Sequence, residues 1–123
     1  IVLWRLTADP RLPALAIDLM DDEDNSVEVS AISVWEVAVK HALDRKGHEA
    51  ITMSGGAFLE ELHLAGIAPF PITAEHASKI DDLPLHHRDP FDRMLVAQAK
   101  SEPMVLLTHD AKLAAYGDCV LVV

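Results

Sequence analysis

Two aspartates three residues apart, Asp89 and Asp92, stand where the sequence predicts the start of a helix. Asp89 is a good N-cap residue, and Pro90 suits the first helical position because its missing N–H would have no partner there. Steps of three and four residues from Asp92 reach Leu95 and Val96, so this acid lies above the apolar stripe of the helix. A carboxylate in that place favours a cation as its partner, although D-P-F-D is also a serviceable capping arrangement.

Two further acids, Glu36 and Asp110, also follow apolar runs and open predicted helices. Carboxylates at successive strand-to-helix junctions collect at one edge of a parallel sheet, so we expect both to meet Asp92 there. Each also has a purely structural interpretation. Glu36 would complete a capping box with Ser33 and pair with Lys40, and Asp110 would simply cap its own helix.

A cluster of three acids with only oxygen ligands favours Mg²⁺ or Mn²⁺ over zinc. Such ions bind phosphate oxygens, which points to phosphoryl chemistry. The run from His86 through His87 to Arg88 is interpreted as loop, because adjacent residues on an extended segment point in opposite directions and do not easily share one ion. Arg88 and Arg93 flank the acids and could hold a substrate phosphate, but arginines beside aspartates more often balance charge.

The chain has 123 residues, half of them apolar, which predicts one domain with a real core. No apolar run approaches the roughly 20 residues of a membrane span, and we expect a cytoplasmic protein without a membrane partner. The single cysteine, Cys119, is expected to pack as a small hydrophobe. Ten basic against twenty acidic residues give a formal charge of −10, which argues against a broad cationic surface for nucleic acid. A nucleic-acid substrate would be held locally, and the acidic surface could attract a basic protein.

Helical and extended patterns alternate along the chain, which predicts an α/β fold with a parallel sheet. Periodicity leaves the start of the chain open between a strand and a buried helix. A polar, glycine-containing loop is expected over 45–56. The remaining predicted elements are helices over 14–20, 33–45, 57–65, 74–83, 90–100 and 110–116, and strands over 27–30, 67–72 (an edge), 104–107 and 119–123.

Three segments together are similar to PIN domains, specifically the VapC-type toxins of toxin–antitoxin pairs. They are VSAISVWEVAVK over 29–40, PLHHRDPFDRMLVAQA over 84–99 and LLTHDAKLAAYG over 106–117. The resemblance covers nearly the whole chain. It implies a three-layer α/β/α sandwich around a central parallel sheet, a metal-dependent endoribonuclease activity on RNA, a homodimer, and a cognate antitoxin that blocks the site.

The resemblance also assigns the family's second, third and fourth acids, carried over by position: Glu36, Asp92 and Asp110. Asp89 would be an additional acid near the metal, and Ser33 and Thr108 would be supporting polar residues. In the ribonuclease mechanism that we expect, the acids hold one or two Mg²⁺ or Mn²⁺ ions, and a water is oriented in line with the phosphodiester.

The departure from the family lies at the front of the chain. In PIN domains a strand that ends in an aspartate, in an L-D-T-H-like run, precedes a helix start like Ile1-Val2-Leu3-Trp4. We expect this strand and the first metal-binding aspartate to precede the printed sequence. A polypeptide that truly began here would lose a central strand and its principal ligand, and would fold poorly or be inactive. The same resemblance makes residues 1–6 helical.

Two other functions remain open from the sequence. A response-regulator-like receiver is also an acidic-pocket α/β domain, but it needs a phospho-acceptor aspartate at a middle strand end and a lysine after a late strand. Here the strand predicted over 27–30 ends in serine, and no lysine follows the last strand. The other alternative is a catalytically dead PIN-like binding module, which the missing front would suit.

Overall fold

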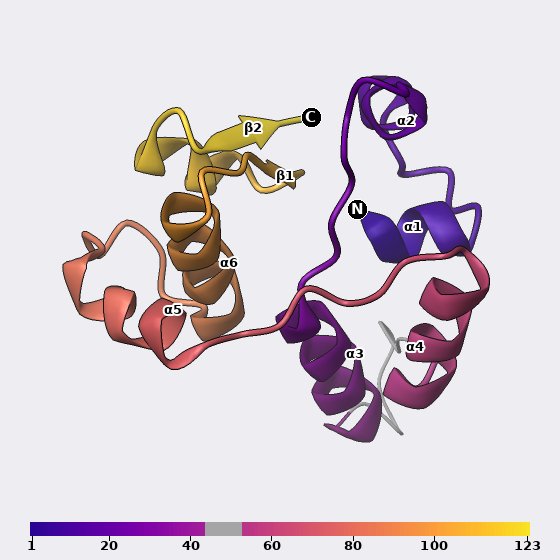
Figure 1. Cartoon of the computed structure of the whole chain (residues 1–123), viewed down its shortest axis with the longest axis horizontal. Helices are drawn as coiled ribbons and strands as arrows, with labels where there is room; N and C mark the ends of the chain where they lie inside the picture. The colour runs from indigo at the N-terminus through magenta and orange to yellow at the C-terminus, as the bar shows by residue number, and fades with distance from the viewer. Residues whose placement is uncertain (44–52) are drawn as a thin grey trace. The chain divides into compact units, whose positions relative to one another are not determined.

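The computed structural model describes residues 1–43 and 53–123, and these form two compact units (Figure 1). The larger unit comprises Ile1–Val27 with Ile72–Val123, and the smaller unit comprises Glu28–Pro71. The last residues of the helix predicted over 33–45, and much of the loop predicted over 45–56, lie outside the described residues. Among the helices of the described ranges, none combines the length and the apolar character that crossing a membrane requires.

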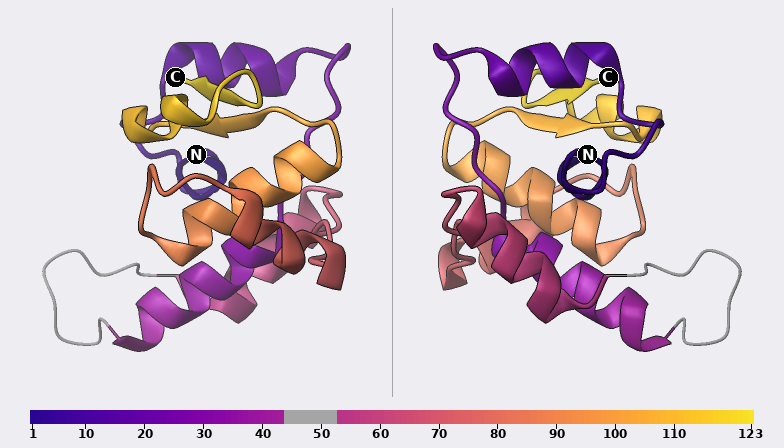
Figure 2. Two further views of the ribbon diagram at one scale, coloured as in Figure 1. Left: turned by 90° about the vertical axis from the view of Figure 1, so that its left-hand side faces the viewer. Right: turned by 90° about the vertical axis from the view of Figure 1, so that its right-hand side faces the viewer.

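The larger unit is mostly helical and carries a two-stranded parallel sheet, which confirms a mixed α/β structure. The strands pair from Leu106 opposite Val120 to Thr108 opposite Val122, and Figure 2 shows them side by side next to α6. The three-layer sandwich with a larger central sheet stays a prediction. The elements of this unit are α1 (Val2–Leu6), α2 (Ala14–Asp21), α5 (Ala74–Ser78), the 3₁₀ helix η1 (Lys79–Asp82), α6 (Pro90–Ser101), β1 (Leu106–Thr108), the 3₁₀ helix η2 (Ala111–Tyr116) and β2 (Val120–Val122).

The local signals for helix starts and ends in this unit are confirmed. Asp89 caps α6 by accepting a hydrogen bond from the Phe91 backbone N–H at 2.8 Å, and Pro90 is the first helical residue. Thr73 caps α5, and Asp110 caps η2. Gly117 ends η2 with a φ of +88°, a conformation in which a residue without a side chain is not strained.

A small hydrophobic core joins α6 to η2 and to the sheet. Its buried members come from three places along the chain, so packing of the unit brings distant segments together. They are Leu83, Val96, Ala97, Leu113 and Tyr116. Cys119 packs against this cluster, as predicted for a small hydrophobe. Burial of these side chains is the main force that fixes α6 against η2.

The smaller unit is a pair of helices, α3 (Ala31–Leu43) and α4 (Gly55–Leu64), which Figure 1 shows side by side. The strands predicted over 27–30 and 67–72 are reduced to one parallel bridge between Ser30 and Phe70. Two backbone hydrogen bonds hold this bridge, from Ala31 N to Phe70 O at 2.8 Å and from Phe70 N to Val29 O at 2.7 Å. The segments are extended there, but they do not form a regular ladder.

Several sequence predictions about element ends are wrong, including the start of α4, which is Gly55 and not Ala57. Ser33 is not an N-cap, because α3 begins at Ala31 and the hydroxyl oxygen of Ser30 accepts the Ile32 backbone N–H at 3.2 Å. The interpretation of Glu36 as the capping-box partner of Ser33 is therefore also wrong. The strand predicted over 104–107 begins later, at Leu106, whose N–H donates to the Cys119 carbonyl. The helix predicted over 74–83 changes to 3₁₀ geometry in its second half. Residues Val2–Leu6 are helical, as the resemblance implied.

Candidate metal centre

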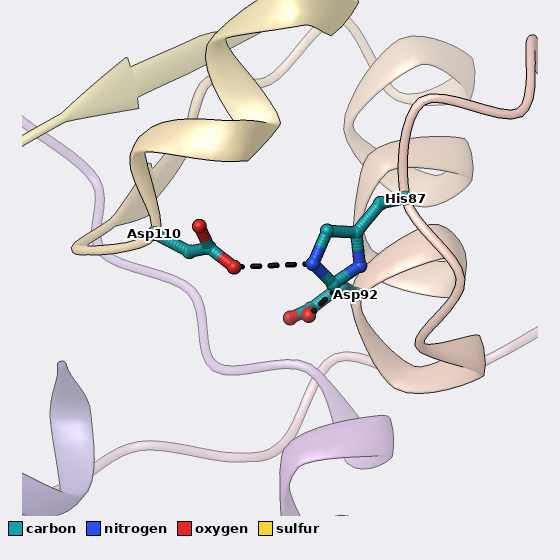
Figure 3. Close-up of side chains that lie close together, drawn as sticks. All are labelled: His87, Asp92 and Asp110. Carbon is teal, nitrogen blue, oxygen red and sulfur yellow. Dashed lines mark hydrogen bonds and ion pairs between the residues drawn. The ribbon is translucent and has the colours of Figure 1, made fainter.

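Three side chains of the larger unit, His87, Asp92 and Asp110, converge to form the candidate metal centre (Figure 3). One ligand atom from each lies within 4.8 Å of the others. His87 belongs to the loop between η1 and α6, Asp92 to the first turn of α6, and Asp110 to the turn that follows β1. The folded chain thus joins donor groups from three separate local structures.

The imidazole ring of His87 interacts with both carboxylates, and Figure 3 marks an interaction from the ring to each acid. Its Nε2 lies 3.1 Å from Asp110 Oδ2, and its Nδ1 lies 3.4 Å from Asp92 Oδ2. The backbone N–H of Asp89 donates to the same Nδ1 at 3.3 Å. The side chains of His87, Asp92 and Asp110 are 13%, 27% and 38% exposed, so the centre is shielded on the histidine side and open on the Asp110 side.

The two carboxylates are held by the elements that carry them. Asp92 lies in the first turn of α6, where the helix dipole favours a negative charge. Asp110 Oδ1 accepts the Lys112 backbone N–H at 2.9 Å, which leaves Oδ2 directed to His87. The Asp110 backbone N–H donates to the Thr108 hydroxyl oxygen at 3.1 Å. The end of β1 therefore sets the position of Asp110 through Thr108.

His87 is held from behind by a buried tyrosine. Its backbone N–H donates to the Tyr116 hydroxyl oxygen at 3.2 Å, and Tyr116 is only 5% exposed. Arg93 Nη1 donates to the same hydroxyl oxygen, also at 3.2 Å. The Arg93 guanidinium has further acceptors at 3.0 to 3.2 Å, the backbone carbonyl oxygens of three residues: Ile80, Leu83 and Pro84. This network fixes the loop that carries His87 against α6 and η2.

The structure therefore brings together two of the acids that the sequence selected, Asp92 and Asp110. Asp89 lies beside the centre, because its backbone N–H donates to His87 Nδ1. Its carboxylate caps α6 by accepting the Phe91 backbone N–H. Glu36 lies on α3 in the smaller unit and forms an ion pair with Lys40 one turn later. The roles of Glu36 and Asp89 as metal ligands stay predictions.

Two supporting residues and one substrate contact were also predicted. Ser33 lies within the first turn of α3, and Thr108 receives the Asp110 amide as described above. Arg93 lies one residue after Asp92, but its terminal nitrogens donate to acceptors inside the chain. Contact of Arg93 with a substrate phosphate stays a prediction, and the role that its geometry supports is to hold the His87 loop.

His87 is the site residue that the sequence interpretation missed. The two adjacent histidines do not share a site: His86 packs edge-on against the Tyr116 ring, with centroids 5.2 Å apart. His87 alone turns to the acids. The hydrogen bond from its backbone to Tyr116, 29 residues later, helps to set this direction, and it is a tertiary contact that no local pattern reveals.

The donor set of the centre fits a divalent cation. Two carboxylates and one imidazole supply the oxygen and nitrogen ligands that such ions take in proteins. A cation would also offset the repulsion between two acids that lie on either side of one ring. The residues that could hold it are Asp92, Asp110 and His87.

The PIN domain family model matches residues 1–118, which include the whole smaller unit, the larger unit up to Asp118 and all three residues of the candidate metal centre. Neither the curated proteins nor the solved structures contain a match to the chain.

Proposed function

Because the chain belongs to the PIN domain family, whose members are typically metal-dependent nucleases, we propose that it is a metal-dependent endoribonuclease that hydrolyses RNA phosphodiester bonds. The observation that carries the proposal is the convergence of Asp92 and Asp110, two residues 18 positions apart in sequence that belong to different elements. If each acid only stabilised the start of its own helix, the two carboxylates would not need to lie close together.

The residues of the centre would divide the work as follows. Asp92 and Asp110 hold a divalent ion, Mg²⁺ or Mn²⁺, with Glu36 and Asp89 as further ligands from the sequence resemblance. When bound, the ion supplies positive charge that favours attack of water on the phosphodiester and stabilises the transition state. A carboxylate oxygen of Asp92 or Asp110 accepts the proton that the attacking water loses. Thr108 keeps Asp110 in place, and Ser33 is a supporting residue of α3.

We further propose that the protein is a VapC-like toxin: a cytoplasmic homodimer neutralised by a cognate antitoxin. The three sequence segments that resemble VapC-type toxins support this finer assignment. Its test is expression of the chain alone and together with the protein encoded beside it. Growth arrest that requires Asp92 and is relieved by that neighbour would support the assignment, and absence of arrest would contradict it. The mass of the purified protein in solution tests the homodimer.

The experiment for the nuclease activity is the substitution Asp92→Asn, assayed on RNA with Mg²⁺ or Mn²⁺. We expect cleavage to fall by roughly 10²–10³-fold, the usual effect of removing one preorganised polar group from a transition-state site. The fold should persist, because Asp89 rather than Asp92 caps α6. The matched control is Asp81→Asn, which removes an equal charge from an exposed position on η1 and should leave cleavage unchanged.

Cleavage by Asp92→Asn at the parent rate would show that the acid is not part of the machinery. The catalytically dead PIN-like module predicts a different result, in which the parent chain binds neither metal nor RNA productively. The response-regulator-like receiver predicts uptake of phosphate from an acyl phosphate, and the PIN match over 1–118 gives that alternative no support.

A further inference from the structure

We infer that His87 is a positioning residue, whose ring holds the Asp110 carboxylate in the orientation in which that acid would bind the ion. This inference rests on the proposed metal-dependent nuclease and deepens it, because it names a side chain that acts on a proposed ligand. His87 lies in the group that converges with Asp92 and Asp110. Its hydrogen bonds, however, direct the ring to Asp110 and not to an ion.

Both ring nitrogens of His87 are engaged within the chain. Nδ1 accepts the Asp89 backbone N–H at 3.3 Å, and this contact occupies the lone pair of that nitrogen. Nε2 lies 3.1 Å from Asp110 Oδ2, and because an ionised carboxylate only accepts, the proton of this contact is on Nε2. The Nε2–H is present both in this neutral tautomer and in the protonated ring, so the contact does not depend on the charge of His87. The ring therefore acts through Asp110.

The hydrogen bond from His87 supports the half of the Asp110 carboxylate that its own helix does not. The Lys112 backbone N–H fixes Oδ1 at 2.9 Å, as expected for a residue that caps η2. The Asp110 side chain is 38% exposed, so burial does not fix Oδ2. The Nε2–H fixes Oδ2 and still leaves a lone pair on that oxygen for an ion. Ligating carboxylates in metal centres are usually hydrogen-bonded in this way, which orients them toward the metal.

The same ring joins the starts of two helices. Its Nδ1 takes the N–H of Asp89, which caps α6, and its Nε2 reaches Asp110, which caps η2. Since the first turn of α6 carries Asp92, the ring helps to set the spacing between two acids from different elements. The ring is itself held, because its side chain is only 13% exposed and its backbone N–H donates to the buried Tyr116 hydroxyl oxygen at 3.2 Å.

The first test is nuclear magnetic resonance of the full chain labelled with ¹⁵N, without added ion. Correlation of the ring nitrogens with the carbon-bound ring protons reports which nitrogen of each histidine carries a proton. We expect a proton on Nε2 of His87, and His87→Gln identifies the signals of this residue by their loss. A folded parent chain in which His87 Nε2 is unprotonated would overturn the inference, whatever the nuclease activity.

The second test separates the two hydrogen bonds of the ring with His87→Gln and His87→Asn. The glutamine amide nitrogen reaches the place of Nε2 and donates to Asp110, whereas the asparagine amide oxygen takes the place of Nδ1 and accepts the Asp89 N–H. By calorimetric titration we expect His87→Asn to weaken Mn²⁺ binding by about 10- to 100-fold, and His87→Gln to weaken it by less than about tenfold. A role limited to holding the loop predicts the reverse order. The reverse order, or equal losses in folded variants, would overturn the inference.

The control for the loop is His86→Ala, which removes the neighbouring exposed ring outside the group that converges and should keep the parent Mn²⁺ affinity. A loss in His86→Ala as large as that in His87→Asn would assign the effect to the loop and overturn the inference. Metal-dependent RNA cleavage by the parent chain would leave the proposed function standing in that case. A parent chain that neither binds Mn²⁺ nor cleaves RNA with metal present would defeat the proposed function together with the inference.

Discussion

At the scale of single residues, the candidate metal centre is built from side chains that have both a local and a distant partner. Asp110 is the clearest case, because one carboxylate oxygen caps η2 through Lys112 and the other meets His87. Capping a helix and contacting a distant side chain are thus compatible uses of one carboxylate, and a good cap is no argument against a role in a site. Sequence reasoning that weighs the two as rivals underestimates residues of this kind.

Glu36 offers the sharpest prediction at this scale, because its ion pair with Lys40 and its proposed role as a ligand give different results. If Glu36 binds the ion, Glu36→Gln should weaken Mn²⁺ binding and slow RNA cleavage by at least about tenfold. If it only pairs with Lys40, the substitution should cost about 0.3–0.5 kcal/mol of stability and nothing else. The measurements are Mn²⁺ titration, cleavage rate and chemical unfolding.

The matched control for Glu36 is Lys40→Gln, which breaks the same ion pair and keeps the carboxylate. Metal affinity should be unchanged in this variant while stability falls by a similar small amount. Equal behaviour of Glu36→Gln and Lys40→Gln in all three measurements would remove Glu36 from the list of ligands.

At the scale of elements, the sequence predicted best what local chemistry determines. The start of α6 follows from a capping aspartate and a proline, and the end of η2 from a glycine at positive φ. These signals act over four or five residues and need no tertiary contact. The start of α3 shows the limit of this reasoning, since Ser30 and Ser33 are both acceptable caps and the structure uses Ser30.

Features that depend on distant contacts were not predictable in the same way. The extended segment at Ser30 pairs with Phe70 through one bridge, because its partner residues come from beyond α4. His87 turns to Asp110, 23 residues later, and nothing in its neighbours specifies that direction. A short apolar or polar run is compatible with more than one local structure. The contacts that the segment makes in the folded chain determine which structure forms.

The hydrogen bond from the His87 backbone N–H to the Tyr116 hydroxyl oxygen of η2 predicts that Tyr116 positions the His87 loop. Tyr116→Phe keeps the buried ring and removes the hydroxyl oxygen that accepts the His87 and Arg93 donors. We expect a loss of stability of about 1–3 kcal/mol from the donors left without this acceptor, and Mn²⁺ affinity about tenfold weaker because the loop is less ordered. Calorimetric titration at a temperature where the variant is folded measures the affinity.

The control for Tyr116→Phe is Val96→Ala, which removes buried volume from the same core cluster and leaves the acceptor of the His87 amide in place. This variant should be destabilised, because a cavity is left in the core, but its metal affinity should stay closer to that of the parent. An equal loss of metal affinity in both variants, each measured where it is folded, would mean that the Tyr116 hydroxyl only stabilises the fold.

The close approach of α3 and α4 gives a second prediction for elements. A Cβ added at Gly55 would lie 2.5 Å from the Ala38 Cβ. Among the described residues and apart from the helix's own backbone, one added at Gly56 would meet nothing closer than the Ser54 hydroxyl oxygen at 4.0 Å. Gly55→Ala should therefore cost about 1–3 kcal/mol through overpacking. Gly56→Ala should be neutral or stabilise by up to about 1 kcal/mol. Denaturant unfolding of the two variants is the measurement, and equal stabilities would show that the helices separate easily.

At the scale of the whole molecule, the charge of −10 constrains how the proposed RNA substrate would be held. A protein that binds nucleic acid over a wide cationic surface releases many counterions, and this chain has twice as many acidic as basic residues. If the chain binds RNA as proposed, the affinity would have to come from a few phosphate contacts close to the candidate metal centre. Arg88 is the candidate for one of these contacts, since it is exposed and directly precedes Asp89.

This constraint predicts a shallow salt dependence of RNA binding. With one or two phosphate contacts, the logarithm of affinity should fall against the logarithm of salt concentration with a slope of about −0.7 to −1.4. Arg88→Gln should reduce the magnitude of the slope by about 0.7, because one contact is lost. Binding is best measured by fluorescence anisotropy with single-stranded RNA, in the cleavage-deficient Asp92→Asn background and at fixed Mn²⁺ concentration.

The control for Arg88 is Lys100→Gln, which removes the same charge from the last turn of α6, at the opposite end of that helix from Asp92. A net charge acts over the whole surface, whereas a phosphate contact acts at one place. The two variants therefore distinguish a local phosphate contact of Arg88 from a general effect of net charge. Local binding predicts that Arg88→Gln changes the slope and Lys100→Gln does not. A parent slope steeper than about −4, or an equal change in both variants, would require a broad cationic surface that the composition does not supply.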